Sequence, residues 1–134
     1  MNLTFSPSAK HWVASPISGS GRGRHLQVPT LNLPPESVPS DLAEGIYACR
    51  ILLHLDDKTE GPFDAAMHYG PRPVFKDSKS CEVHLIDRAL PSPPDKVTVE
   101  VVGRIRDVED FASAELLKEA MQQDIEKAKI LLKQ

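Results

Sequence analysis

Apolar and polar residues alternate along residues 80–87 and 96–105, and this period of two predicts β-strands. Residues 46–55 are rich in β-branched and large apolar residues and are expected to form a long strand, with residues 63–69 as the returning strand. Residues 56–62 (DDKTEGP) are rich in turn-forming residues, so they are expected to connect the latter two strands as a hairpin. These segments predict a mainly antiparallel sheet.

A shorter strand is expected at residues 11–17, where Pro16 restricts it to an edge or an early end. Strands of this number, joined by short turns, indicate a sheet that closes into a small barrel. The chain holds 12 prolines, all between residues 7 and 94, and this distribution argues against a helical bundle.

The period changes to a helical one near the C-terminus. Ser113 is a suitable N-cap, and Glu115 suits the positive end of a helix. Helical spacing relates the positions that would face the barrel, which are Leu117, Ala120, Met121, Asp124, Ala128 and Leu131. We expect one helix of about 20 residues that packs this stripe against one side of the barrel.

Length and charge narrow the class of protein. The 134 residues fit one domain, expected at residues 11–134 with a loose tail at 1–10. A net charge of −3 and the lack of a long apolar run predict neither a nucleic-acid partner nor a membrane. The two cysteines, Cys49 and Cys81, lie in apolar segments and are expected to be buried, reduced thiols of a cytoplasmic protein, although a bridge between them stays open.

A glycine-rich, cationic segment occupies residues 18–24 (SGSGRGR). Glycines allow backbone N–H groups to approach phosphate oxygens, and the arginines add charge and donors. The segment matches neither the P-loop nor the dinucleotide-binding pattern. A phosphate-binding loop and a flexible, solvated turn are both compatible with it.

Thr30 and Asn32 are two residues apart, so they share a face if the chain is extended there. A hydroxyl and an amide oxygen suit Mg²⁺, which prefers oxygen ligands and relies on substrate phosphates for the rest. The alternative is an ordinary polar strand edge.

Glu82 is a charged residue inside the apolar strand at 80–87. In an alternating strand Cys81 and Val83 face one way, and Glu82 and His84 face the other. A carboxylate directed into the mouth of a barrel could accept a proton from a substrate hydroxyl. The alternative is a solvent-facing carboxylate. The sequence has no HxH or HExxH pattern, so His84 does not predict a zinc site.

The order of these segments resembles the riboflavin kinase family. Residues 21–32 (GRGRHLQVPTLN) are similar to its glycine–arginine loop followed by Pro-Thr-Ala-Asn, and residues 81–87 (CEVHLID) to its Glu-Val-His-Leu-x-Asp strand. Further similarities cover residues 44–48 (EGIYA), residues 69–75 (YGPRPVF), and a closing segment with Arg104–Asp107, Phe111 and residues 124–126.

This resemblance implies a fold, a reaction and a set of site residues. The fold is a six-stranded antiparallel Greek-key barrel with a C-terminal helix, and the reaction transfers the ATP γ-phosphoryl group to riboflavin, giving FMN. It implies a requirement for Mg²⁺, and we expect a monomer. By matching position, Glu82 is the catalytic base, Thr30 and Asn32 bind Mg²⁺ and the phosphates, and Arg106 lies near the flavin. The nucleotide loop would consist of Gly21, Arg22, Gly23 and Arg24.

The chain departs from the family pattern at several positions. Leu31 stands in place of alanine, Gln27 in place of glycine and Val74 in place of threonine. Residues 91–94 (PSPP) replace an Asp-Leu-Tyr-Gly segment in the loop that helps to close over the flavin. A non-catalytic nucleotide- or flavin-binding module of the same fold is therefore the alternative, followed by an accessory domain that binds another protein.

Overall fold

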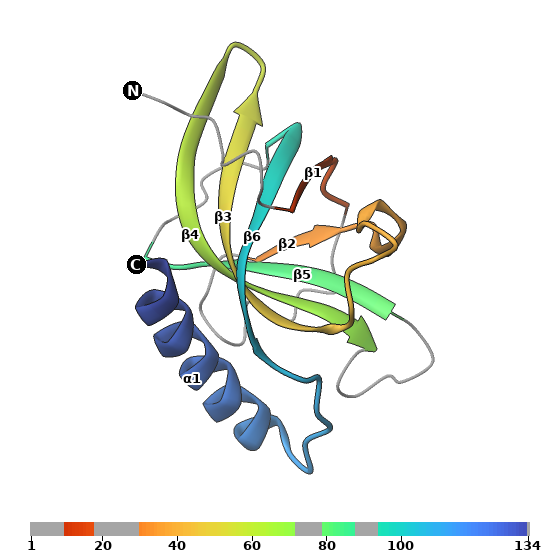
Figure 1. Ribbon diagram of the computed structural model, residues 1–134, viewed down its shortest axis with the longest axis vertical. Coiled ribbons are helices and arrows are strands. Elements are labelled where there is room, and N and C mark those ends of the chain that lie inside the picture. Colours follow the sequence, from red (N-terminus) through yellow and green to blue (C-terminus); the bar gives the residue numbers. More distant parts are fainter. Residues whose placement is uncertain (1–9, 18–29, 72–78, 88–93, 134) are drawn as a thin grey trace.

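The computed structural model describes residues 10–17, 30–71, 79–87 and 94–133. They form a curled antiparallel sheet with one helix against its outer side (Figure 1). The elements are β1 (His11–Ala14), β2 (Thr30–Leu33), the short 3₁₀ helix η2 (Pro35–Ser37), β3 (Gly45–Leu55), β4 (Lys58–Pro71), β5 (Lys79–Leu85), β6 (Lys96–Arg106) and α1 (Ala114–Leu132).

The strands follow the order β1-β6-β3-β4-β5-β2 in one six-stranded sheet. Strands β3, β4 and β5 form a meander, and β6 returns to lie beside β3, which is a Greek-key arrangement. The predicted antiparallel Greek-key barrel with a C-terminal helix is confirmed.

A short contact joins the two edges of the sheet. β1 and β2 are the edge strands, and Ile17, just beyond β1, donates its backbone N–H to the carbonyl of Asn32 in β2 at 2.7 Å. This single bridge links the two edges of the sheet, and Asn32 pairs with Glu82 of β5 on its other side.

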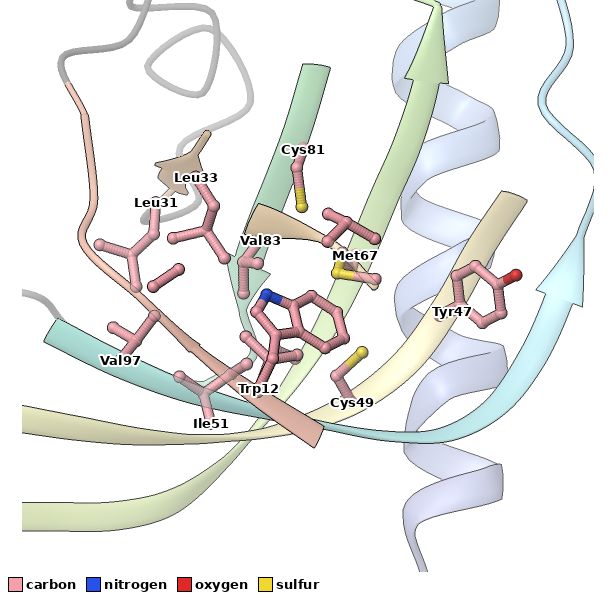
Figure 2. Packing of buried hydrophobic residues seen from close by; sticks show 14 of the residues in the cluster. Trp12, Leu31, Leu33, Tyr47, Cys49, Ile51, Met67, Cys81, Val83 and Val97 are labelled. Carbon is pink, nitrogen blue, oxygen red and sulfur yellow. The ribbon is translucent and has the colours of Figure 1, made fainter. Parts of the chain in front are cut away.

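The inner face of the sheet holds the apolar core. Trp12 of β1, Cys49 and Ile51 of β3, and Met67 of β4 point into one interior (Figure 2). Leu31 belongs to the same buried cluster, so the residue that replaces the family's alanine points into the core. Cys49 and Cys81 are buried and free, as predicted.

The outer face is covered in part by α1. Small residues lie under the helix: Ala48 and Ala66 pack in one cluster with Ala128 and Leu132. Gly103 belongs here too, because a Cβ on it would lie 3.4 Å from the Leu131 side chain. The helix begins where expected, since the Ser113 side chain accepts a hydrogen bond from the N–H of Leu116 at 3.2 Å.

The hairpin between β3 and β4 differs from the prediction. Residues 56–62 were expected as the connection, yet β4 already begins at Lys58. Gly61 and Pro62 lie within β4, where the register passes from Ile51 opposite Phe63 to Leu53 opposite Glu60. This irregularity accommodates a proline that cannot donate to the ladder and a glycine with φ of 111°. In the part of the chain that the structure describes, no helix is long and apolar enough to cross a membrane.

Candidate active site

Polar side chains of β5 and β2 meet on the outer face of the barrel. In β5 the residues Cys81, Val83 and Leu85 belong to the inner core, so Ser80, Glu82 and His84 face outward. In the antiparallel register, Asn32 lies opposite Glu82 and Thr30 lies opposite His84. Thr30 and Asn32 are therefore neighbours of Glu82 although about 50 residues separate them in the chain.

The same row of residues continues across the sheet. His68 of β4 lies opposite Glu82, Ile46 of β3 opposite His68, and Arg106 of β6 opposite Ile46. Three strand spacings separate Arg106 from Glu82, which is roughly 14 Å. Arg106 thus shares the face of the candidate site but lies at its other end, with His68 between.

Glu82 is buried on this outer face, with 9% of its surface exposed. Its Oε2 atom accepts a hydrogen bond from the Ser80 hydroxyl at 3.2 Å. The alternative of a solvent-facing carboxylate is wrong, because Glu82 is buried. Glu82 lies on the opposite face of β5 from the apolar core that fills the interior of the barrel. A buried carboxylate beside polar partners is a group that can take up a proton.

His84 lies opposite Thr30 on the neighbouring strand. Its Nδ1 atom lies 2.9 Å from the Thr30 hydroxyl oxygen. Burial lowers the pKa of His84 to about 4, against the opposing effect of the Glu82 and Asp124 carboxylates. His84 is consequently neutral at pH 7, so it orients Thr30 without adding positive charge to the site.

His68 lies on the other side of Glu82. Its Nδ1 atom is 3.5 Å from the Ser80 hydroxyl, and burial lowers its pKa although Glu82 opposes the shift. Within the described residues its Nε2 atom is buried and has no hydrogen-bond partner. Sequence reasoning missed His68, because nothing in the alternation of 63–69 marks it before strand pairing sets it beside Glu82.

Arg106 is held by an acid from the helix. Its Nε and Nη2 atoms each donate to a carboxylate oxygen of Asp124 at 2.8 Å. The Asp124 carboxylate is buried, with 4% of the residue exposed, and the Arg106 guanidinium also lies 5.6 Å from the centre of the Phe111 ring. Asp124 was predicted only as part of the helical stripe; an acid within an otherwise apolar stripe was the available indication of a buried cationic partner.

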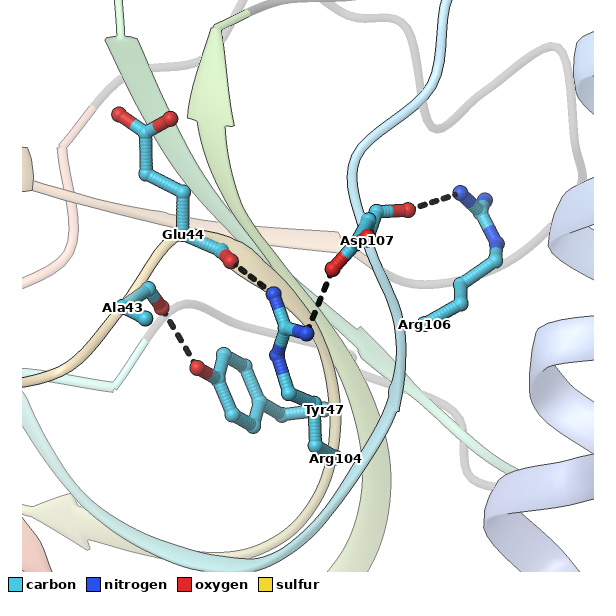
Figure 3. Close-up of polar contacts among 6 residues, drawn as sticks. All are labelled: Ala43, Glu44, Tyr47, Arg104, Arg106 and Asp107. Carbon is cyan, nitrogen blue, oxygen red and sulfur yellow. Dashed lines mark hydrogen bonds and ion pairs between the residues drawn. The ribbon is translucent and has the colours of Figure 1, made fainter.

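A second arginine, Arg104, holds the end of strand β6 that carries Arg106 (Figure 3). Arg104 donates to the carbonyl of Glu44 and, at 2.6 Å, to the carboxylate of Asp107. Gly45 lies beside it, and a Cβ there would lie 2.7 Å from the Arg104 guanidinium, so a larger residue would displace that side chain. These contacts fasten β6 to the start of β3 next to Arg106.

Part of the predicted site lies outside the described residues. The segment 18–29 contains the predicted nucleotide loop, which is Gly21, Arg22, Gly23 and Arg24. Val74 falls in the segment 72–78, and residues 91–93 of the 91–94 segment fall in 88–93. Of the predicted residues that are described, the fold brings together Thr30, Asn32 and Glu82 and sets Arg106 apart on the same face.

Comparison with known proteins identifies relatives over almost the whole chain. The flavokinase family model, described as riboflavin kinase, matches residues 11–132. Riboflavin kinase of Mus musculus is 33% identical over 119 residues, which is 84% of this chain and 74% of that protein. Riboflavin kinase of Homo sapiens is 32% identical over 119 residues, which again is 84% of this chain and 74% of that protein.

Other relatives are longer or more distant. A trifunctional protein RibF/MnmA of Mycoplasmoides gallisepticum is 29% identical over 81% of this chain, which spans only 16% of that protein. Riboflavin kinase from Trypanosoma brucei superposes with a TM-score of 0.62 at 17% identity, over 92% of this chain and 80% of that one. A macrolide-efflux protein from Streptococcus pneumoniae superposes with a TM-score of 0.66 at 25% identity, over 89% of this chain and 38% of that one.

Proposed function

Because the chain belongs to the riboflavin kinase family, we propose that it transfers the γ-phosphoryl group of ATP to the 5′-hydroxyl of riboflavin, giving FMN and ADP. One observation carries this proposal: strand pairing sets Asn32 opposite Glu82 and Thr30 opposite His84, so metal ligands and a base can act on one phosphoryl group. Phosphoryl transfer requires mainly such positioning and charge neutralisation.

Glu82 would act as the general base. As the riboflavin hydroxyl attacks phosphorus, its proton would pass to the Glu82 carboxylate, and the bond between the γ-phosphorus and the bridging oxygen would break. Burial of Glu82 favours this role, because a carboxylate shielded from bulk water keeps a fixed orientation toward the hydroxyl.

Thr30 and Asn32 would hold Mg²⁺, which when bound neutralises charge on the phosphates. The donor set fits the ion: both residues offer neutral oxygens, and Mg²⁺ usually takes few protein ligands and completes its shell with water and phosphate. The hydrogen bond between the Thr30 hydroxyl and His84 Nδ1 would hold this ligand in a fixed orientation.

The remaining predicted residues would bind the two substrates. Gly21, Arg22, Gly23 and Arg24 would contact the ATP phosphates, and Arg106 would lie toward the flavin. The separation of roughly 14 Å between Arg106 and Glu82 supports this division, because the flavin ring and the reacting hydroxyl are at opposite ends of riboflavin.

The test is FMN formation from riboflavin and Mg-ATP, separated by chromatography, with Glu82→Gln as the control. Wild type that produces FMN, and a variant that does so far more slowly, would support both the reaction and the base. Wild type that binds Mg-ADP in calorimetry but forms no FMN would instead identify the non-catalytic module of the same fold. Wild type that does neither would overturn both functions.

We also infer that the protein works as a cytoplasmic monomer. The two buried free thiols support a reducing compartment, since a thiol pair in an oxidising one tends to be bridged. Light scattering tests the monomer: a mass near twice 14.8 kDa would overturn it.

A further inference from the structure

We propose that Ser80 is a positioning residue that holds the Glu82 carboxylate in its reactive orientation, an inference that rests on the proposed function. Ser80 lies two residues before Glu82 on the same face of β5, and its hydroxyl donates to Glu82 Oε2 at 3.2 Å. Ser80 is itself 5% exposed, so water competes little for this hydrogen bond.

The neighbouring strand leaves the Ser80 hydroxyl few other partners. Its cross-strand neighbour in β4 is Gly70, which has no side chain, and Gly70 has φ of 148°, which disfavours other residues. The polar atoms that the structure places near the hydroxyl are those of Glu82 and, diagonally across the strands, His68. The hydroxyl is therefore directed toward the carboxylate by the fold.

The hydrogen bonds of Ser80 have a direction. The hydroxyl proton goes to Glu82 Oε2, because a carboxylate oxygen accepts. The Ser80 oxygen also lies 3.5 Å from His68 Nδ1, so its contact with the carboxylate is the shorter of the two.

A base must stay within hydrogen-bond reach of the proton that it accepts, and small displacements cost rate. Fixing one carboxylate oxygen limits rotation of the carboxyl group. Removal of the Ser80 hydroxyl should therefore lower kcat by about tenfold, while KM for riboflavin and Mg-ATP changes by less than about twofold.

The experiment compares steady-state FMN formation by wild type, Ser80→Ala and Ser80→Thr, with thermal unfolding measured for each. Ser80→Thr keeps the hydroxyl and should recover most of the lost kcat. Thr98→Val is the matched control, since it removes another buried hydroxyl, bonded to His54 at 2.6 Å, from a distant strand. It should lower stability and leave kcat unchanged.

A double variant tests whether Ser80 acts through Glu82. In a Glu82→Gln background the change Ser80→Ala should have little further effect on kcat, because the base is already lost. A further tenfold loss there, or a wild-type kcat in Ser80→Ala alone, would overturn the positioning role while the proposed function stands. Absence of FMN formation by wild type would overturn the proposed function and this role together.

Discussion

The two faces of β5 are both buried and have opposite chemistry. Cys81, Val83 and Leu85 face the barrel interior, whereas Ser80, Glu82 and His84 face outward. The inner side chains contact other apolar side chains (Figure 2), while Ser80 and His84 on the outer side make hydrogen bonds to polar partners. Burial by itself therefore does not distinguish core from site in this protein; the partners of the buried groups do.

Burial also acts on the titratable groups of both faces. It raises the pKa of the Cys81 thiol to about 12 on the inner face and lowers the pKa of His84 to about 4 on the outer face. In each case the neutral form is favoured, because a low-dielectric environment disfavours charge. The Cys81 thiol is thereby kept unreactive, and His84 is kept as a neutral hydrogen-bonding group.

The largest difference between the two faces is expected for Glu82→Gln, which should affect activity but not stability. It keeps the shape of the outer residue and removes a base, so we expect kcat to fall by about 10²- to 10⁴-fold while the unfolding free energy changes by less than about 1 kcal/mol. FMN chromatography and chemical denaturation measure the two quantities. A loss of activity that tracks a loss of folded protein would show that Glu82 is structural.

The inner face should behave in the opposite way. Ile51 is fully buried, and Ile51→Ala should lower the unfolding free energy by about 2–5 kcal/mol through lost burial and a cavity. At a temperature where the variant is still folded, its kcat should stay within about threefold of wild type. Urea denaturation and FMN formation test this prediction. A large fall in kcat of the folded variant would mean that packing in the core also controls the geometry of the outer face.

The outer face should also give stability a pH dependence. His84 is held neutral when folded but titrates near 6.5 when unfolded, so its contribution is complete above pH 6.5 and is lost as the pH falls toward 4. The expected loss of unfolding free energy at pH 4 is about 3 kcal/mol, and burial of His68 adds in the same direction.

Urea denaturation from pH 7 to 4 measures this effect, with His84→Gln compared to wild type. The His84 variant should lose less stability on acidification than wild type. Equal acid sensitivity in the two proteins would contradict the buried, neutral state of His84.

The smallest effect is expected at the helix that covers part of the outer face. Ser113→Ala removes the N-cap hydrogen bond to Leu116 and should lower the unfolding free energy by about 1 kcal/mol. Ser113→Asp should retain the stability, since aspartate also caps. Neither change should alter kcat, because the cap lies outside the row of residues from Asn32 to Arg106. An altered kcat would show that the stability of α1 affects the activity of the site.

Several features of the site were accessible from the sequence. Alternation in 80–87 correctly set Glu82 and His84 on one face, and the spacing of Thr30 and Asn32 set them on one face of a strand. The roles of Glu82, Thr30, Asn32 and Arg106 remain predictions. Residues 56–62 were placed wrongly because a glycine and a proline in a strand irregularity have the same composition as a turn.

The sequence alone determined the periods, the helix cap and the two sides of each strand, because these follow from local geometry between residues a few positions apart. Only the tertiary structure decided which outward residues become neighbours. Antiparallel pairing of β2, β5 and β4 placed Asn32 and His68 on either side of Glu82, and docking of α1 gave Arg106 its partner Asp124. Register and helix packing depend on contacts between distant parts of the chain, which no local pattern records.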